Sequence, residues 1–385
     1  MNKKSEEKSK LKPINSVEIS NFTVFKKNEI QFSKGLNIFI GKNGTGKTHL
    51  LKLINCLDNN FYTLAKENKK YKSEEDDIKT FSVIDSKSFP IPSSFLKLYN
   101  KYVYSNDAKK EMFNSKKILV KFNKYISLQL DNRIYSFVPH NRNGITINTK
   151  VFKREFFLKY KKTYKLKNNK FTFIPCKDIL TSSKGFSALY DSRYINFESV
   201  YYNIIKKSEL PIIRDLDEDF INIAKKIEEA IGGTAIYKNN YFLMDYKNIG
   251  EIYFDMVAEG HKKLALIYIL IMNGEIDKNT VLLLDEPESN LNPQLTDLLV
   301  EILLSLSKLG CQIFIATHNT FILDDIEIQR KKEHKILYHS FYFDDKNKAN
   351  GVNIETKEFL KDLEHNDIEE KIIKQHNDYL DKEFS

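Results

Sequence analysis

A phosphate-binding loop is indicated by the run Gly41-Lys42-Asn43-Gly44-Thr45-Gly46-Lys47-Thr48, which has the required residue types and spacing. Its glycines let the backbone approach a phosphate without a Cβ in the way, so that successive N–H groups can point at it. Lys47 would bridge the β- and γ-phosphates of ATP, and Thr48 would place its hydroxyl on Mg²⁺. The run follows an apolar strand and opens a helix, so His49 is expected at the nucleotide as well. These residues predict a chain that binds ATP with Mg²⁺ and hydrolyses it.

Two adjacent carboxylates, Asp285 and Glu286, follow a buried strand expected over 281–284. Asp285 can hold Mg²⁺ directly or through water. Glu286 points the other way and can act as a general base that polarises the attacking water. Alone, an apolar run before Asp-Glu is common, and its plain interpretation is a strand end that reaches solvent. Here the pair lies about 235 residues after the phosphate-binding loop and precedes Pro-Glu-Ser-Asn-Leu-Asn-Pro, which favours the catalytic interpretation.

A histidine ends the next buried strand, expected over 311–316, in the sequence Ala316-Thr317-His318. A histidine at this place can hydrogen-bond a γ-phosphate. Taken alone, a histidine at a strand end is more often a structural hydrogen-bonding residue. The two preceding motifs make a catalytic role for His318 the preferred interpretation.

The elements that would hold these residues alternate between strands and helices, which favours an α/β fold with a parallel sheet. Strands are expected over 16–22, 29–32, 36–40, 118–122, 125–130, 134–138, 145–147, 171–174, 281–284, 311–316 and 334–343, with a hairpin within 234–245. Helices are expected over 49–57, 191–206, 213–231, 259–273, 294–309 and 357–384.

The composition sets limits on the class of protein. The 385 residues are 41% hydrophobic and include no apolar stretch of the roughly 20 residues that a membrane span needs, so we expect a cytoplasmic protein without membrane contact. The three cysteines have no zinc-binding spacing and are expected to be reduced and mostly buried. The net charge of +9 leaves nucleic-acid binding open, and the lysine- and aromatic-rich stretch 153–167 is either a contact surface or a solvated face.

In the order of these motifs the chain resembles an ABC-type ATPase head, of the soluble branch that includes SMC and RecF-like proteins and the overcoming-lysogenisation-defect nucleases. Residues 257–263 (Val-Ala-Glu-Gly-His-Lys-Lys) stand where that family has its signature helix. Residues 289–293 stand at its D-loop, and His318 stands at its switch histidine. The resemblance implies an α/β P-loop NTPase fold, an ABC-ATPase head with a mixed sheet and an inserted, mainly β and helical region.

The resemblance also implies a head-to-tail dimer of this chain, open to higher assembly, in which each ATP lies between one phosphate-binding loop and the other copy's signature. Glu259, Gly260 and His261 would then contact nucleotide. Ala258 and Glu259 replace the serine and glycine of transporter signatures, and a negative Glu259 beside a triphosphate is unfavourable unless it turns away or caps the helix.

A glutamine loop typical of the family is not recognisable in the sequence. Residues 173–178 lie about where it should be, so Lys177 or Asp178 could serve in its place; the segment could equally be a plain strand exit.

A narrower resemblance is to compact bacterial ATPases labelled "AAA family", such as the ATPase subunits of Septu-like and retron-associated anti-phage modules. It rests on Ala-Glu-Gly-His-Lys-Lys-Leu, Asp-Glu-Pro-Glu-Ser-Asn-Leu-Asn-Pro and Ile-Ala-Thr-His-Asn. It implies a separate nuclease or toxin effector as partner. Asp324-Asp325 and Asp344-Asp345 are interpreted as loop carboxylates and not as part of a fused nuclease. The alternatives are a RecF-type DNA-repair ATPase and, less favoured, the nucleotide-binding subunit of a transporter.

The expected organisation follows from these assignments. Residues 1–12 form a disordered tail, 13–60 the first part of the ATPase head, 61–170 an insertion, 171–355 the second part of the head, and 356–385 a C-terminal helix.

Overall fold

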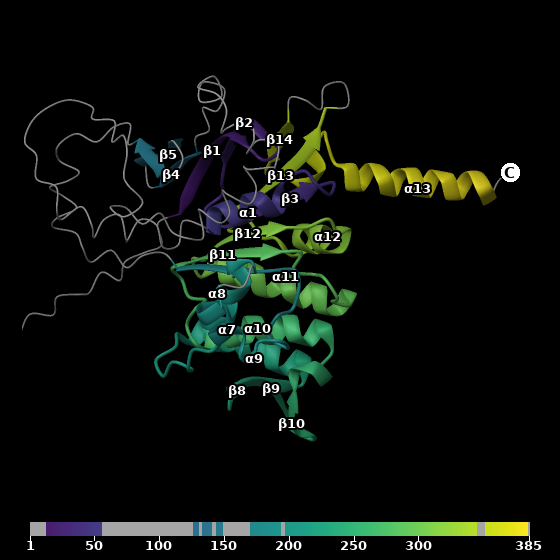
Figure 1. Cartoon of the computed structure of the whole chain (residues 1–385). Coiled ribbons are helices and arrows are strands. Elements are labelled where there is room, and N and C mark those ends of the chain that lie inside the picture. Colours follow the sequence, from purple (N-terminus) through teal and green to yellow (C-terminus); the bar gives the residue numbers. More distant parts are fainter. Residues whose placement is uncertain are drawn as a thin grey trace, which may run out of the picture. The chain divides into compact units, whose positions relative to one another are not determined.

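The computed structural model describes residues 13–55, 170–193, 197–344 and 351–383, and the backbone of three further strands within 126–148 (Figure 1). The tail 1–12, most of the insertion 61–170, the strand expected at 118–122, the stretch 153–167 and Asp345 lie outside the described residues. The chain divides into two compact units, 1–34 with 56–170 and 35–55 with 171–385. None of the described helices is long and apolar enough to cross a membrane.

The first unit holds an antiparallel sheet in the order β2-β1-β4-β5-β6. Its strands are β1 (Ile14–Phe22), β2 (Phe25–Gln31), β4 (Ile126–Leu130), β5 (Arg133–His140) and β6 (Gly144–Asn148). The strands expected over 16–22 and 29–32 correspond to β1 and β2, which pair antiparallel with buried Val17 opposite buried Ile30. Because β1 also pairs with β4, the N-terminal strands share a sheet with the inserted strands. The expected grouping of 13–34 with the phosphate-binding loop therefore differs from the observed one, because strand alternation does not reveal a pairing partner so distant in sequence.

The second unit is built on a six-stranded sheet in the order β14-β13-β3-β12-β11-β7. Its strands are β3 (Leu36–Gly41), β7 (Lys170–Ile174), β11 (Thr280–Asp285), β12 (Gln312–Ala316), β13 (Ile336–Phe343) and β14 (Val352–Lys357). The pairs β11–β12, β12–β3 and β3–β13 are parallel, and β14 runs antiparallel to β13. The central strands are buried, as their continuous apolar runs predict for a sheet covered on both faces. The α/β fold with a mixed, mostly parallel sheet is confirmed.

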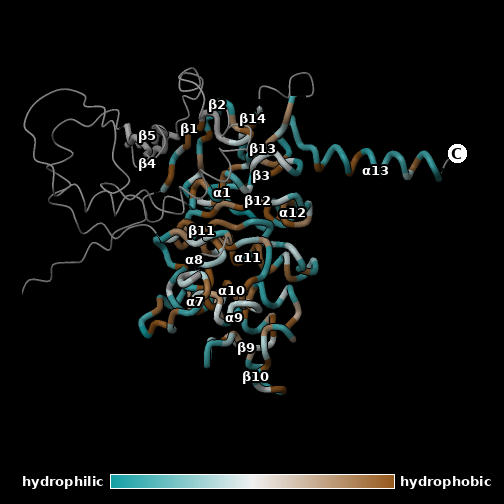
Figure 2. Tube along the Cα trace, viewed as in Figure 1, coloured by the Kyte–Doolittle hydropathy of each residue, from teal (hydrophilic) through white to brown (hydrophobic). Residues whose placement is uncertain are grey.

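The helices of this unit pack in layers beside the sheet, apart from α13, which extends away from it (Figure 1). They are α1 (Lys47–Asn55), α7 (Phe186–Arg193), α8 (Ser199–Ser208), α9 (Glu218–Ile231), α10 (Glu259–Met272), α11 (Pro293–Lys308), α12 (Thr320–Gln329) and α13 (Asp367–Glu383). In Figure 1, α11, α10 and α9 lie in successive layers on one side of β11 and β12. Figure 2 shows hydrophobic residues concentrated along β11, β12 and α10. Because α10 is apolar on almost every side, it is buried between its neighbours.

Capping residues fix where several of these helices begin. Asn292 accepts a hydrogen bond from Leu295 N at 2.8 Å, and Pro293 occupies the first position of α11. Asn319 accepts one from Phe321 N at 2.8 Å and starts α12 directly after His318. The segment that carries His318 is thus held between a buried strand and a capped helix.

A small antiparallel sheet, β10-β9-β8, lies beyond α9 (Figure 1). The expected hairpin is confirmed as β8 (Gly233–Lys238) and β9 (Tyr241–Tyr246), and β10 (Gly250–Tyr253) extends it.

The C-terminal helix expected over 357–384 is wrong at its beginning, because α13 begins only at Asp367. Lys357 is instead the last residue of β14, an edge strand that pairs antiparallel with β13. A short 3₁₀ turn, Leu360–Asp362, separates β14 from α13.

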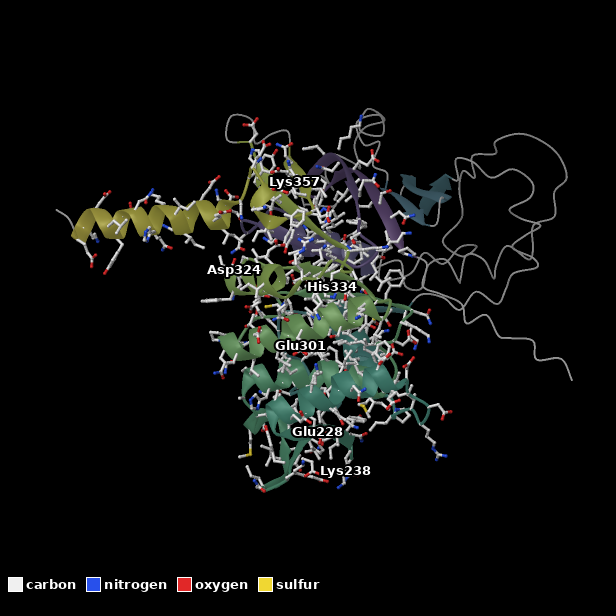
Figure 3. All side chains as sticks on the ribbon, turned by 180° about the vertical axis from the view of Figure 1, so that it is seen from behind. Glu228, Lys238, Glu301, Asp324, His334 and Lys357 are labelled. Atoms are coloured by element: carbon white, nitrogen blue, oxygen red, sulfur yellow. The ribbon has the colours of Figure 1, made fainter. Side chains whose placement is uncertain are left out.

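Other helix predictions need smaller corrections. The helix expected over 191–206 is two helices, α7 and α8, and the one expected from 213 begins at Glu218 after the N-cap Asp217. Asp324 and Asp325 are not loop carboxylates as expected, because both lie on α12, a helix that was not predicted. Figure 3 labels Asp324.

Candidate functional site

The phosphate-binding loop joins the carboxyl end of β3 to the first turn of α1, as predicted. Gly41, Gly44 and Gly46 have φ angles of 132°, 83° and 96°, a region that favours glycine. A Cβ on Gly41 would collide with the carbonyl of Phe341 on β13, whereas one on Gly44 would meet nothing within 4 Å. The loop therefore packs tightly on its strand side and is open at Gly44, which suits a backbone cradle for phosphates.

Lys47 directs its ammonium group back across this loop. Its Nζ donates to the carbonyl oxygens of Gly41 at 2.5 Å and Lys42 at 3.0 Å. Burial lowers the pKa of Lys47, and the carboxylates of Glu286 and Asp285 oppose that shift. The ammonium group of the predicted phosphate-binding lysine thus lies against the loop backbone, close enough to the two predicted carboxylates for their charges to affect its pKa.

Thr48 and Asp285 meet directly, since the Thr48 hydroxyl donates to Asp285 Oδ1 at 2.8 Å. Burial raises the pKa of Asp285, and the hydrogen bond from Thr48 partly opposes that rise. A hydroxyl and a carboxylate from two elements are ligands that Mg²⁺ accepts. The described residues contain no group of three or more His, Cys, Asp and Glu side chains suited to a metal. The Thr48–Asp285 pair offers a cation two oxygen ligands, one from α1 and one from β11.

Glu286 and His318 form the second predicted pair, with His318 Nδ1 at 3.0 Å from Glu286 Oε1. Glu286 has a φ angle of 46°, which is rare for a residue with a side chain, and its N–H donates to Ala316 O at 2.8 Å. Strained backbone of this kind is common at catalytic positions.

Glu288 connects the carboxylate turn to the histidine strand. It is buried, and its Oε1 accepts a hydrogen bond from the Thr317 hydroxyl. Thr317 Oγ1 in turn accepts from Asn319 N at 3.0 Å. Burial raises the pKa of Glu288. Glu288 was not predicted as a site residue, although its place three residues after Asp285 in the Asp-Glu-Pro-Glu run is a recognisable signal.

The signature segment packs on the D-loop of the same chain. A Cβ on Gly260 would lie 2.8 Å from Asn290 O, so only glycine fits there without a shift. Glu259 does not cap α10; its Oε1 lies 2.6 Å from Lys262 Nζ, and its side chain is half exposed. Gly260 thus contacts the D-loop, and Glu259 contacts Lys262 within the signature segment. The positive charge of Lys262 partly neutralises the negative charge of Glu259. His261 follows on the first turn of α10.

Cys176 lies where a glutamine loop was sought. Its Sγ is 3.5 Å from Glu286 Oε2 and 3.3 Å from Ser289 Oγ. Asp178 instead accepts hydrogen bonds from Leu180 N and Thr181 N, so its carboxylate shapes the local turn. Cys176 was expected only as one of three reduced, mostly buried thiols, and it is half-buried. No spacing in the sequence pairs it with Glu286.

These features define a P-loop ATPase-type α/β domain. The phosphate-binding loop lies between a strand and a helix of a parallel sheet, and Asp285 and His318 lie at the ends of the next strands. The chain belongs to the family described as "AAA domain, putative AbiEii toxin, Type IV TA system", whose family model matches residues 36–324. The match contains all the site residues named above. No curated protein matches the sequence.

Among solved structures, the chain is similar to SMC heads at low identity. The SMC head domain from Thermotoga maritima is 13% identical, with a TM-score of 0.44 over 90% of this chain and 99% of that one. An SMC head bound to the C-terminal winged-helix domain of ScpA is 14% identical, with a TM-score of 0.49 over 91% and 98%. A third, an SMC head with an extended coiled coil bound to the C-terminal domain of ScpA derived from Pyrococcus furiosus, is 12% identical, with a TM-score of 0.45 over 95% and 100%.

Proposed function

We propose that this chain binds ATP with Mg²⁺ and hydrolyses it. The single observation that carries the proposal is that two pairs, Thr48 with Asp285 and Glu286 with His318, lie at the carboxyl ends of neighbouring parallel strands. Ligands of open α/β sheets bind at this edge of the strands.

Each side chain has a distinct role in this proposal. The N–H groups of residues 41–48 and the ammonium of Lys47 bind the phosphates, and Thr48 and Asp285 hold the cation. Bound Mg²⁺ would neutralise charge that develops on the phosphate oxygens. Glu286 accepts a proton from the attacking water, and His318 orients the Glu286 carboxylate through its Nδ1.

We also propose that ATP joins two copies head to tail, with Glu259, Gly260 and His261 of one copy facing the nucleotide of the other. Glu259, the first residue of α10, is half exposed, and the first N–H groups of a helix have no acceptor within the helix. The N-terminus of α10 adds partial positive charge toward a γ-phosphate. Hydrolysis would remove that phosphate and release the dimer.

The biological role we propose is control of a separate effector, a nuclease or toxin, in cytoplasmic anti-phage defence. The family description names a toxin of a type IV toxin–antitoxin system, which is in keeping with a role in such modules. The neighbouring genes test this role: a nuclease or toxin gene beside this one supports it, and a permease gene would point to transport instead.

Phosphate release from ATP tests the enzymatic part. The wild-type chain should release phosphate with Mg²⁺ and should stop when the cation is chelated. Glu286→Gln should bind ATP and release phosphate at least about 100-fold more slowly, since it cannot accept the proton. Glu229→Gln, an exposed glutamate on α9, is the matched control and should behave as wild type. Wild-type turnover by Glu286→Gln would show that another group is the base.

A further inference from the structure

Both oxygens of the Glu286 carboxylate have a partner in the structure. His318 Nδ1 lies 3.0 Å from Oε1, and Cys176 Sγ lies 3.5 Å from Oε2. A carboxylate held at one oxygen can still rotate about its terminal bond, because that torsion is broad. Contacts at both oxygens fix the carboxylate plane, and each oxygen keeps a second lone pair for a proton.

The Cys176 side chain is suited to donate in this contact. Burial raises the pKa of the Cys176 thiol, so it carries its proton at neutral pH. A thiol has one S–H, and if that proton points to Glu286, the Ser289 hydroxyl can donate to the sulfur at 3.3 Å. The result is a directed chain from Ser289 through Cys176 to Glu286.

The backbone turn that carries Cys176 is held by the signature helix. Lys263 on α10 is buried, and its Nζ donates to the carbonyl oxygens of Cys176 at 2.8 Å and Pro175 at 3.0 Å. A buried ammonium is costly unless it is hydrogen-bonded, so these carbonyls strongly favour one position for the turn. The contact with Lys263 holds the backbone of Cys176 in place, and so keeps its thiol beside the Glu286 carboxylate.

We propose that Cys176 is a positioning residue for Glu286, which it holds through its thiol while Lys263 fixes the turn on which it stands. This inference rests on the proposed ATPase function and adds a residue to that site. It concerns the rate of hydrolysis and not the binding of nucleotide, because Cys176 contacts Glu286 and Ser289 and not the phosphate-binding loop.

Three variants test the inference. Cys176→Ala removes the donor, Cys176→Ser restores a donor of smaller radius, and Ser182→Ala is a control on an exposed serine of the same loop. We expect Cys176→Ala to lower kcat about 3- to 10-fold, with affinity for a non-hydrolysable ATP analogue within about 2-fold of wild type. Cys176→Ser should recover at least half of the lost rate, and Ser182→Ala should have no effect.

A double variant separates positioning from a general structural role. In Glu286→Gln the base is already absent, so adding Cys176→Ala should change the residual single-turnover rate by less than about 2-fold. The inference is overturned if Cys176→Ala turns over as wild type, if Cys176→Ser is no better than Cys176→Ala, or if the loss persists in the Glu286→Gln background. A wild-type chain without turnover would contradict the proposed function itself, which is a different result.

Discussion

The Thr48 hydroxyl and the Asp285 carboxylate, 237 positions apart in the sequence, lie 2.8 Å apart at the end of the central strands. One residue belongs to the first turn of α1 and the other ends β11. The hydrogen bond brings the phosphate-binding loop and the acidic strand into one site. Burial disfavours the charged form of the Asp285 carboxylate and raises its pKa. Carboxylates with a pKa shifted in this way are common at functional sites.

Asp285→Asn should therefore raise the stability of the fold and lower the rate of ATP hydrolysis. Because burial raises the pKa of Asp285, its charged form is disfavoured in the folded state, and the neutral amide removes that cost at neutral pH. We expect the melting temperature without nucleotide to rise by about 2 °C. Turnover should fall at least about 100-fold and require more Mg²⁺. Calorimetry and a Mg²⁺ titration of phosphate release measure the two effects, and a lower melting temperature would contradict the first.

Gly260→Ala should weaken the dimer without weakening nucleotide binding by one head. The added Cβ would lie 2.8 Å from Asn290 O, so the D-loop must shift at a cost of about 1–3 kcal/mol. We expect ATP-dependent dimerisation to be lost while analogue affinity stays within about 2-fold. Gly250→Ala is the control, since it strains a positive-φ glycine in the β9–β10 turn without crowding. Equal dimerisation by Gly260→Ala and wild type would show that the signature segment does not form the dimer contact.

The Asp367 carboxylate should oppose phosphate binding. Asp367, the first residue of α13, lies 2.8 Å from Lys42 Nζ in the phosphate-binding loop. Asp367→Asn removes a negative charge next to the incoming phosphates, so ATP affinity should rise about 2- to 3-fold at low salt and less at high salt. Asp381→Asn near the other end of α13 is the control. Titration calorimetry at two salt concentrations tests this, and an unchanged or weaker affinity at low salt would contradict it.

Stability should fall in mildly acidic solution because of His339. Its ring is fully buried, with Nδ1 at 2.9 Å from Thr356 Oγ1, and burial lowers its pKa to about 3. Between that value and the ordinary value of about 6.5, the unfolded chain binds a proton that the folded chain does not, so stability is lost as the pH falls. The loss from this group is about 2 kcal/mol at pH 5.

Urea unfolding at pH 7 and pH 5 measures this contribution. His339→Gln should lose less stability between the two pH values than wild type, because it has no proton to take up. His376→Gln, on the exposed face of α13, should lose as much as wild type. The assignment fails if His339→Gln retains the full pH dependence.

The sequence predicted the parts of the site that depend on local pattern. Glycine spacing predicted the loop at 41–48, and apolar runs that end in polar residues predicted Asp285 and His318 at strand ends. Parallel strands then bring those ends to one edge of the sheet. The helix expected over 294–309 begins one position earlier, at Pro293.

The sequence did not predict features that depend on tertiary packing. The contact of Cys176 with Glu286 arises because Lys263, 87 positions away, holds the Cys176 carbonyl. The edge strand β14, which pairs with β13, was not predicted, because the sequence showed no partner strand for residues 352–357. Neither relationship has a periodicity or spacing that a single sequence displays.

The molar mass of Glu286→Gln in solution tests the central claim most directly, namely that ATP bound at this site joins two heads. The account predicts a monomer without nucleotide and a stable dimer with ATP and Mg²⁺, because binding is intact and hydrolysis is blocked. Lys47→Ala should stay monomeric in both conditions. A Glu286→Gln chain that binds ATP and Mg²⁺ yet keeps the mass of a monomer would contradict the claim.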